Sequence, residues 1–240
     1  MGTVFSAGAW ATVWQYRGTF VNGLLNTLQS AAVGLLIAIV IGFTLGLMAT
    51  GGKRALRAVA RVYVEFFQNT PLILQVCFFY YALAYSGVHI AVVTVGFLAL
   101  GLYHGAYVAE VVRAGIQSIP FGQFDAANSQ GFSYADTMRL IILPQTVKII
   151  LPPMVNQVVA LIKNTSFLYI IGGADLIATT YNFVTGASTG GAYGPAYLVG
   201  GLLFFVVCFP LSFFAGRWEE RLKARERVSA AQLDEAEVSA

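Results

Sequence analysis

Charged side chains are scarce in this chain. Of its 240 residues, 14 are Lys or Arg and 11 are Asp or Glu, so charged residues make up 10% of the sequence, whereas 58% are hydrophobic. Ordinary soluble domains are about 25% charged. The composition therefore excludes a typical soluble globular protein and indicates that lipid surrounds most of the chain.

Cysteine is nearly absent, and so are the motifs of nucleotide binding. Cys77 and Cys208 both lie in apolar runs, where they are expected to pack as small hydrophobic side chains. We therefore predict neither a disulfide framework nor a metal site. The sequence contains no G-x-x-x-x-G-K-[ST] loop, so we predict that this chain holds no nucleotide and no cofactor of its own. The weak net charge of +3 is not arranged as a basic face for nucleic acid.

Long apolar runs dominate the sequence instead. Five of them reach the roughly 20 residues that a helix needs to cross about 30 Å of hydrocarbon, which predicts an all-α membrane protein with five transmembrane helices. The predicted spans are 20–49, 58–85, 90–113, 153–173 and 195–216. The second contains Pro71, which is expected to kink the helix, either as the hinge of a gate or, as we favour, through packing geometry alone.

The positions of the basic residues predict the orientation, because loops rich in Lys and Arg stay on the cytoplasmic side. These residues follow the first, third and fifth spans, whereas the connections 86–89 and 175–194 contain none. We therefore place the N-terminus outside and the C-terminus inside. Residues 1–216 form the predicted transmembrane domain, and 217–240 a charged cytoplasmic tail. The basic residues concerned are Lys53, Arg54, Arg57, Arg61, Arg113, Arg139, Lys148, Arg217, Arg221, Lys223, Arg225 and Arg227.

The segment 118–151 is the longest predicted cytoplasmic connection. Residues 123–130 can form about two helical turns, which Gly131 ends. Asp125 is expected in the first turn, where a negative charge favours the helix dipole. The two alanines that follow it leave this helix thin enough to enter a groove on another protein. We therefore predict a short coupling helix through which a membrane domain receives motion from a soluble partner.

The spacing in this segment resembles the EAA loop of the permease subunits of ABC importers. It runs Asp125-Ala126-Ala127, three residues, Gly131, nine residues, Ile141, one residue and Leu143-Pro144. Over about residues 22–216 the chain also resembles the polar amino acid permease family. The further matching residues are Asn69-Thr70-Pro71-Leu72 with Gln75, Ala106 to Glu110 with Arg113 and Gly115, Pro152-Pro153, Asn156 and Lys163 to Ser166. It departs from the family at Asp125, where Glu is usual, and at Gln68, where a basic residue is usual.

This resemblance implies a permease subunit of an ATP-driven importer for polar amino acids, multi-pass in the bacterial plasma (inner) membrane. It implies as partners two cytoplasmic ATP-binding subunits, a second permease copy or a paralogue, and an extracytoplasmic amino-acid-binding protein. ATP and Mg²⁺ would be bound by the ATPase subunits, so this chain is expected to be a transport subunit and not an enzyme. The residues expected to couple it to the ATPase are Gln123, Asp125, Ala126, Ala127, Gly131, Leu143 and Pro144.

Ionisable residues at membrane depth are costly and indicate function. Three qualify in the predicted spans. Glu65 and Glu110 lie near basic residues of their own helices, and ion pairs with Arg61 and Arg113 are the favoured interpretation. Lys163 differs, because it lies near the middle of the fourth predicted span with no acidic neighbour in that helix.

Lys163 belongs to a polar stripe, because at about 100° per residue it falls within roughly 120° of arc with Asn156, Gln157, Ala160 and Asn164. Two interpretations stay open: hydrogen bonding between helices, or the lining of a substrate path. The residues of the predicted path are Asn156, Gln157, Ala160, Lys163, Asn164, Thr165 and Ser166. Their amides, hydroxyls and single cation favour glutamate, aspartate or glutamine, whereas a basic amino acid would require a carboxylate.

Two other classes of function remain as alternatives beside a permease for basic amino acids. A passive channel for polar solutes would also use a polar stripe, but it would carry flux without ATP or a soluble partner. An intramembrane hydrolase would need a nucleophile with a base, for which His104 and Ser166 are the available pair. No residue is expected to orient that imidazole, which argues against the hydrolase.

Overall fold

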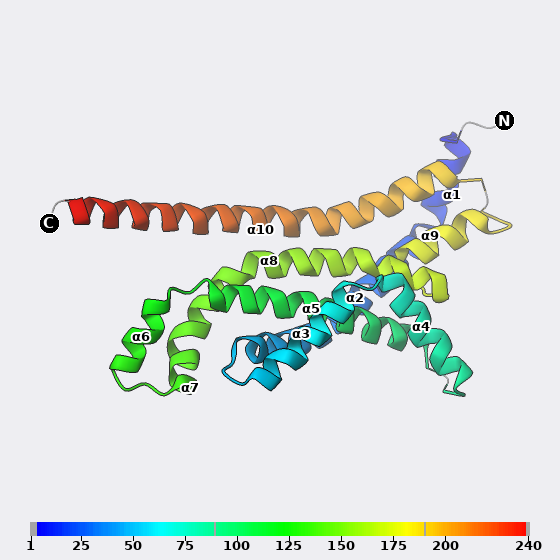
Figure 1. Ribbon diagram of the computed structural model, residues 1–240. Helices are drawn as coiled ribbons and strands as arrows, with labels where there is room; N and C mark the ends of the chain where they lie inside the picture. Colours follow the sequence, from blue (N-terminus) through cyan, green and yellow to red (C-terminus); the bar gives the residue numbers. More distant parts are fainter. Residues whose placement is uncertain (1–3, 89, 190, 239–240) are drawn as a thin grey trace.

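The chain folds into a bundle of long helices. The computed structural model describes residues 4–88, 90–189 and 191–238, and this part of the chain contains no β-strand. The predicted helical fold is confirmed. Figure 1 shows α6 and α7 at one end of the bundle and α1 and α9 at the other. In chain order the helices are α1 (Ala7–Gln15), α2 (Arg17–Thr50), α3 (Arg54–Gln68), α4 (Leu72–Tyr85), α5 (Val92–Gln117), α6 (Phe121–Ser129), α7 (Tyr134–Asp136), a π-helical turn η1 (Thr137–Ile142), α8 (Leu143–Asn164), a 3₁₀ turn η2 (Thr165–Ile171), α9 (Leu176–Thr185) and α10 (Tyr193–Val238).

Four helical segments of the described chain are long and apolar enough to cross a membrane. They are Arg17–Thr50, Val92–Gln117, Tyr134–Ile171 and Tyr193–Leu222. Each of them contains or overlaps one of the predicted spans, and α10 then continues as helix to Val238, through most of the predicted tail.

The predicted second span, 58–85, is two helices and not one kinked helix. α3 ends at Gln68 and α4 begins at Leu72, with Pro71 at its N-cap in an extended conformation (φ −62°, ψ 130°). A proline lacks the N–H that would continue the first helix, and it disfavours helical geometry at the preceding residue. The expectation of a kink at Pro71 is therefore wrong. α4 alone, with 14 residues, extends for about 21 Å.

Gln75 holds this break together. Its Nε2 donates to the carbonyl oxygen of Phe67 at 3.2 Å and to the side-chain oxygen of Thr70 at 2.6 Å. The side chain is buried. It thus satisfies a carbonyl at the C-terminal end of α3 that has lost its helical partner.

The fourth span begins well before residue 153. The helix runs without interruption from Tyr134, and Pro144 lies inside it. A proline ring clashes with the carbonyl four residues earlier, and the wider π-helical turn η1 precedes Pro144 directly. In this turn the N–H of Leu143 bonds to the carbonyl of Met138, five residues back. The π turn therefore lets the helix pass the proline.

Small residues bring α2 and α5 into the closest contact of the bundle. A Cβ added to Gly42 would lie 2.3 Å from Cγ1 of Val108, and one added to Gly46 would lie 2.6 Å from Cγ1 of Val112. Only glycine allows the two backbones to approach so closely. Helices α3, α4, α8 and α9 pack against this pair.

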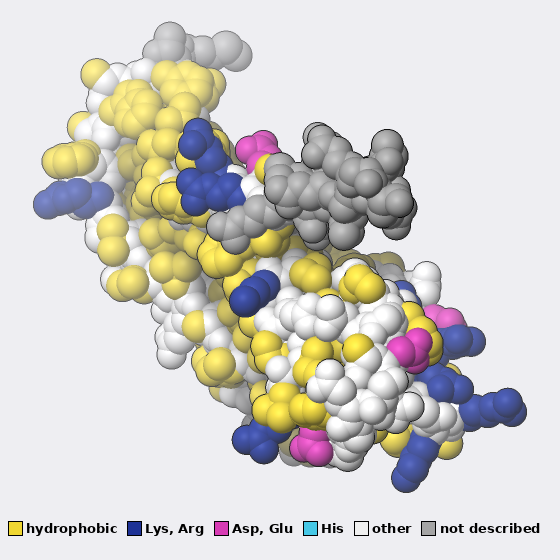
Figure 2. Space-filling model, turned by 90° about the vertical axis from the view of Figure 1, so that its left-hand side faces the viewer, with side chains coloured by type: hydrophobic (Ala, Val, Ile, Leu, Met, Phe, Trp, Pro, Cys, Tyr) yellow, Lys and Arg dark blue, Asp and Glu magenta, His cyan; other side chains and the backbone are white. Residues whose placement is uncertain are grey.

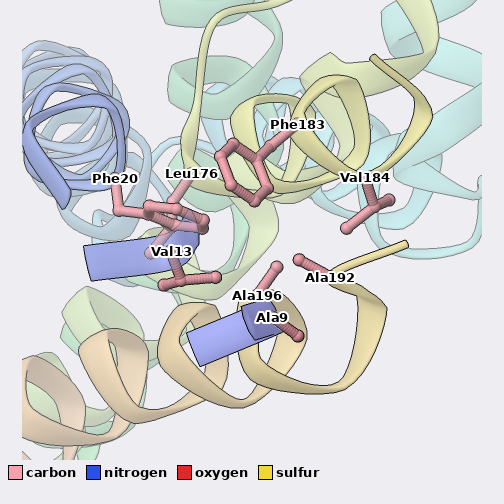
Figure 3. Packing of buried hydrophobic residues seen from close by; sticks show 8 residues of the cluster. All are labelled: Ala9, Val13, Phe20, Leu176, Phe183, Val184, Ala192 and Ala196. Carbon is pink, nitrogen blue, oxygen red and sulfur yellow. The ribbon is translucent and has the colours of Figure 1, made fainter. Parts of the chain in front are cut away.

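A hydrophobic cluster closes the end of the bundle opposite α6. Figure 3 shows its side chains converging from α1, α2, α9 and the start of α10. Neither α1 nor α9 is predicted by the apolar runs of the sequence. The cluster consists of Ala9, Val13, Phe20, Leu176, Phe183, Val184, Ala192 and Ala196.

Candidate substrate path and coupling surface

The coupling helix α6 is held to the bundle by one side and exposed on the other. Ala127 is 3% exposed, and Phe124 packs against a buried cluster that includes Ile116 and Ile142. Gln123, Asp125 and Ala126 lie on the exposed side. Of the two alanines of the EAA pattern, one therefore anchors the helix and the other is free to contact a partner.

The register of α6 differs from the prediction. The helix begins at Phe121, directly after Pro120 at the N-cap, and its first turn contains no acidic residue. Asp125 consequently lies in the second turn, so the expectation that it stabilises the N-terminal turn through the helix dipole is wrong. Its carboxylate points outward and is available to a partner.

Gly131 ends this segment by its conformation, as predicted. Its φ of +81° lies in the left-handed region, which residues with a Cβ rarely adopt. The N–H of Gly131 bonds to the carbonyl of Asn128 at 3.0 Å, and that of Phe132 to the carbonyl of Ala127 at 3.1 Å. These bonds satisfy carbonyls at the end of α6 and turn the chain toward α7.

The distant part of the EAA pattern lies against the same cluster as α6. Ile141 and Leu143 are partly buried and pack on the core group that also holds Phe124. Pro144 is exposed. The structure therefore joins the two halves of the pattern into one unit, with α6 outermost and η1 beneath it.

Half of the predicted polar stripe on α8 is used for hydrogen bonds within the bundle. Nδ1 of the buried His104 on α5 lies 3.3 Å from Oε1 of Gln157, and its Nε2 lies 3.1 Å from Nδ2 of Asn164. Both contacts are satisfied when Nδ1–H donates to Gln157 and Nε2 accepts from Asn164, which is a neutral imidazole. Because both ring nitrogens bond to amides, His104 does not form the dyad with Ser166 that a hydrolase would need.

The other half of the stripe faces outward. Asn156 and Lys163 are exposed, and Ala160 between them is partly buried. In the part of the chain that the structure describes, no hydrogen bond or ion pair of either polar side chain is found. Thr165 is buried and donates to the carbonyl of Ile162 at 2.8 Å. Hydrogen bonding between helices is therefore confirmed for Gln157 and Asn164, whereas the lining of a substrate path by Asn156 and Lys163 stays a prediction.

A charged cleft between α3 and α5 was not identified from the sequence. It has a volume of about 490 Å³. The expected ion pair of Glu110 with Arg113 is confirmed at 2.7 Å, but within the described residues no ion pair joins Glu65 to Arg61. The polar side chains that line the cleft are Arg57, Arg61, Glu65, Gln68, Glu110, Arg113 and Gln117. The first four recur every three or four residues along α3, a spacing that marks one helix face and that would have indicated the cleft.

The cleft continues toward the exposed stripe of α8. Glu110 lines both this cleft and a second hollow between α5 and α8, whose far wall includes Pro153. Pro153 precedes Asn156 by three residues and so lies on the same face of α8. A hollow with a mainly apolar wall therefore lies between the charged cleft of α3 and α5 and the exposed stripe of α8.

Comparisons with known proteins give the same assignment as the EAA pattern. Residues 38–224 match the family described as binding-protein-dependent transport system inner membrane component. The probable glutamine ABC transporter permease protein GlnM of Bacillus subtilis is 35% identical over 204 residues, which cover 85% of this chain and 93% of the relative. The glutamine transport system permease protein GlnP of Escherichia coli is 32% identical over 216 residues, 89% of this chain and 97% of the relative.

Solved structures agree with this assignment. A chain in the crystal structure of an amino acid ABC transporter with histidines superposes with a TM-score of 0.80 at 31% identity, over 88% of this chain and 98% of that chain. A chain of the inward-facing MetNI methionine ABC transporter superposes with a TM-score of 0.65 at 17% identity, over 85% of this chain and 98% of that chain, which supports the fold alone. This protein therefore belongs to the inner membrane components of binding-protein-dependent transport systems, as an ABC importer permease of the polar amino acid family.

Proposed function

We propose that this chain is the membrane-spanning subunit of an importer for glutamine or an acidic amino acid, with its substrate path along the exposed face of α8. The observation that carries the proposal is the exposure of Asn156 and Lys163 on a helix long and apolar enough to cross a membrane. Polar groups at that depth are costly when they face lipid and are expected to face protein or a water-filled path.

The proposed topology has five crossings, with α3 and α4 together forming the second. The segments that are rich in Lys and Arg, at the start of α3 and around α6 to α8, lie at the same end of the bundle (Figure 1). We place this end in the cytoplasm. The end formed by α1 and α9 then faces the binding protein outside a bacterial inner membrane.

The polar face of one chain is open on one side, so the path requires a second chain. The charged cleft between α3 and α5 would form its cytoplasmic mouth, and the stripe of α8 its middle. We propose a second permease copy or a paralogue as the opposite wall. Two cytoplasmic ATPase subunits, which bind ATP and Mg²⁺, would each receive an α6 helix through Gln123, Asp125 and Ala126.

The substrate class follows from the chemistry of the exposed stripe. An amide and an ammonium group offer hydrogen bonds and a positive charge to a carboxylate, and they offer no anion to a cationic side chain. The relatives named as glutamine permeases support the neutral member of this class. The carboxylates of Glu65 and Glu110 lie in the cleft and not in the stripe.

The test is uptake and ATP hydrolysis by the complex with its binding protein in proteoliposomes, with glutamine, glutamate, aspartate, arginine and histidine. We expect stimulation by the first three. Asn156→Asp places a negative charge in the path and is expected to lower glutamate uptake roughly tenfold, or about 1.4 kcal/mol, while glutamine uptake falls less. The control is Asn182→Asp on α9, an exposed asparagine away from the stripe.

Three results would contradict the proposal. Stimulation by arginine or histidine alone would assign the chain to basic amino acids. Flux without ATP would indicate a passive channel. Equal effects of the two Asn→Asp variants would remove the stripe from the path.

A further inference from the structure

A groove between α8 and α10 lies outside both the polar face and the coupling surface. It has a volume of about 780 Å³. Figure 2 views the molecule from the end that carries α6 and shows Lys and Arg side chains gathered on that end. The groove is lined by Lys148 of α8 and by Phe213, Phe214, Arg217, Trp218 and Arg221 of α10.

The polar lining of this groove is of one charge. Lys148, Arg217 and Arg221 contribute three cations, and no carboxylate is among the lining residues. The guanidinium of Arg217 lies 4.7 Å from the ring centroid of Phe213, which fixes it against the apolar wall. The groove therefore favours a ligand that carries negative charge.

The position of the groove along α10 indicates what kind of anion fits. Residues 195–216 contain no charged residue, and Arg217 is the first charge after them. The groove thus lies where the helix leaves the hydrocarbon layer. Trp218 is 49% exposed at this level, and exposed tryptophans are enriched where a membrane meets water.

The apolar wall extends toward the membrane interior. Phe213 is 44% and Phe214 69% exposed. A soluble anion would contact only the cations of the groove, whereas a phospholipid would also place an acyl chain against these rings. Three cations above an exposed apolar wall match the two parts of a phospholipid.

We propose that this groove binds one anionic phospholipid, with its phosphate between Arg217, Arg221 and Lys148 and an acyl chain against Phe213 and Phe214. The charge of the site selects a headgroup with a net negative charge over phosphatidylcholine, whose ammonium the three cations repel. The inference depends on α10 crossing the membrane and not on which amino acid is transported.

The experiment measures lipid binding on the assembled complex by native mass spectrometry, with phosphatidylglycerol and phosphatidylcholine as probes. The variant is Arg217→Gln with Arg221→Gln. Each basic residue near a membrane surface contributes about 1 kcal/mol to anionic lipid binding, so the double variant should bind phosphatidylglycerol about 30-fold more weakly. Lys148→Gln provides a milder variant if the double one does not fold.

The matched control removes two arginines elsewhere at the same end of the molecule, Arg54→Gln with Arg139→Gln, both exposed and outside the groove. We expect this control to keep the tight lipid. The proposal would be overturned if both double variants weakened phosphatidylglycerol binding equally. It would also be overturned if the unaltered complex retained phosphatidylcholine as well as it retains phosphatidylglycerol. Lipid binding to the isolated permease that disappears in the assembled complex would also overturn the proposal, because a protein partner would then cover the groove. Competition by soluble glycerol phosphate alone would indicate an anion site without a lipid chain.

Discussion

Two asparagines of α8 have opposite environments, and their replacement separates a structural role from a transport role. The side chain of Asn164 is bonded to His104, which is 2% exposed. Asn156 is exposed, and its side chain has no hydrogen bond within the described residues. Asn164→Leu removes an interhelical bond of about 0.6 kcal/mol on average and at most about 1.7 kcal/mol. It also leaves a buried ring nitrogen unpaired, at a cost of about 1–3 kcal/mol. Together these two costs give an expected loss of about 2–5 kcal/mol.

The measurement is the free energy of unfolding of the permease in a fixed detergent mixture, with a double-mutant cycle on Asn164→Leu and His104→Leu. The cycle is expected to give a coupling of about 0.6–1.7 kcal/mol. Asn156→Leu should leave the unfolding free energy within about 0.5 kcal/mol and should lower uptake. Equal destabilisation by the two asparagine variants, or a coupling of zero, would refute the assigned environments.

Three other predictions concern the scaffold. Gly42→Ala is expected to lower the free energy of unfolding, measured by thermal unfolding, by about 1–3 kcal/mol, because its Cβ would lie 2.3 Å from Cγ1 of Val108. Gly201→Ala is the control and should leave that free energy unchanged, because no atom lies within 4 Å of the added Cβ. Gly131→Ala forces a Cβ into left-handed geometry at about 1–2 kcal/mol and should lower substrate-stimulated ATP hydrolysis; unchanged hydrolysis would contradict a role for this turn. Burial raises the pKa of Asp175 above its ordinary value, so the native state holds this proton more tightly than the unfolded state does. Stability is therefore expected to fall as the pH rises from the ordinary to the raised pKa. Asp175→Asn can still cap α9 and should remove that dependence in a pH series of melting temperatures.

The helices could be predicted from the sequence wherever one strong signal decided them. Long apolar runs located α2, α5 and α10, and Gly131 marked the end of α6 correctly. Proline was the ambiguous signal. Pro71 ends a helix and Pro144 does not, and the difference is in the surrounding residues. At Pro71, the side chain of Gln75 bonds to the carbonyl of Phe67, which the proline leaves without an N–H partner. Before Pro144, a π-helical turn carries the helix past the proline.

The polar stripe shows why a site is harder to predict than a helix. The helical period determines which side chains share a face of α8, but it does not identify the neighbouring helix. Gln157 is paired to a histidine 53 residues away in the chain, and no local pattern announces that contact. The charged cleft is missed for the opposite reason. The spacing of polar residues on α3 is visible in the sequence, but Arg61 and Glu65 are interpreted there as an ion pair within one helix and Arg57 as a loop residue.

The exposed surfaces of this chain divide into two kinds, and the difference argues for a second subunit. On α2 the exposed side chains include Leu36 at 65% and Val40 at 67%, which lipid covers without cost. On α8 the exposed residues Asn156 and Lys163 are polar, and lipid in the hydrocarbon layer would cover them only at a high cost in free energy. The described chain leaves both side chains exposed, so it does not surround them by itself. We therefore expect a partner surface, with water between the two, to cover the polar face, as proposed above for the substrate path.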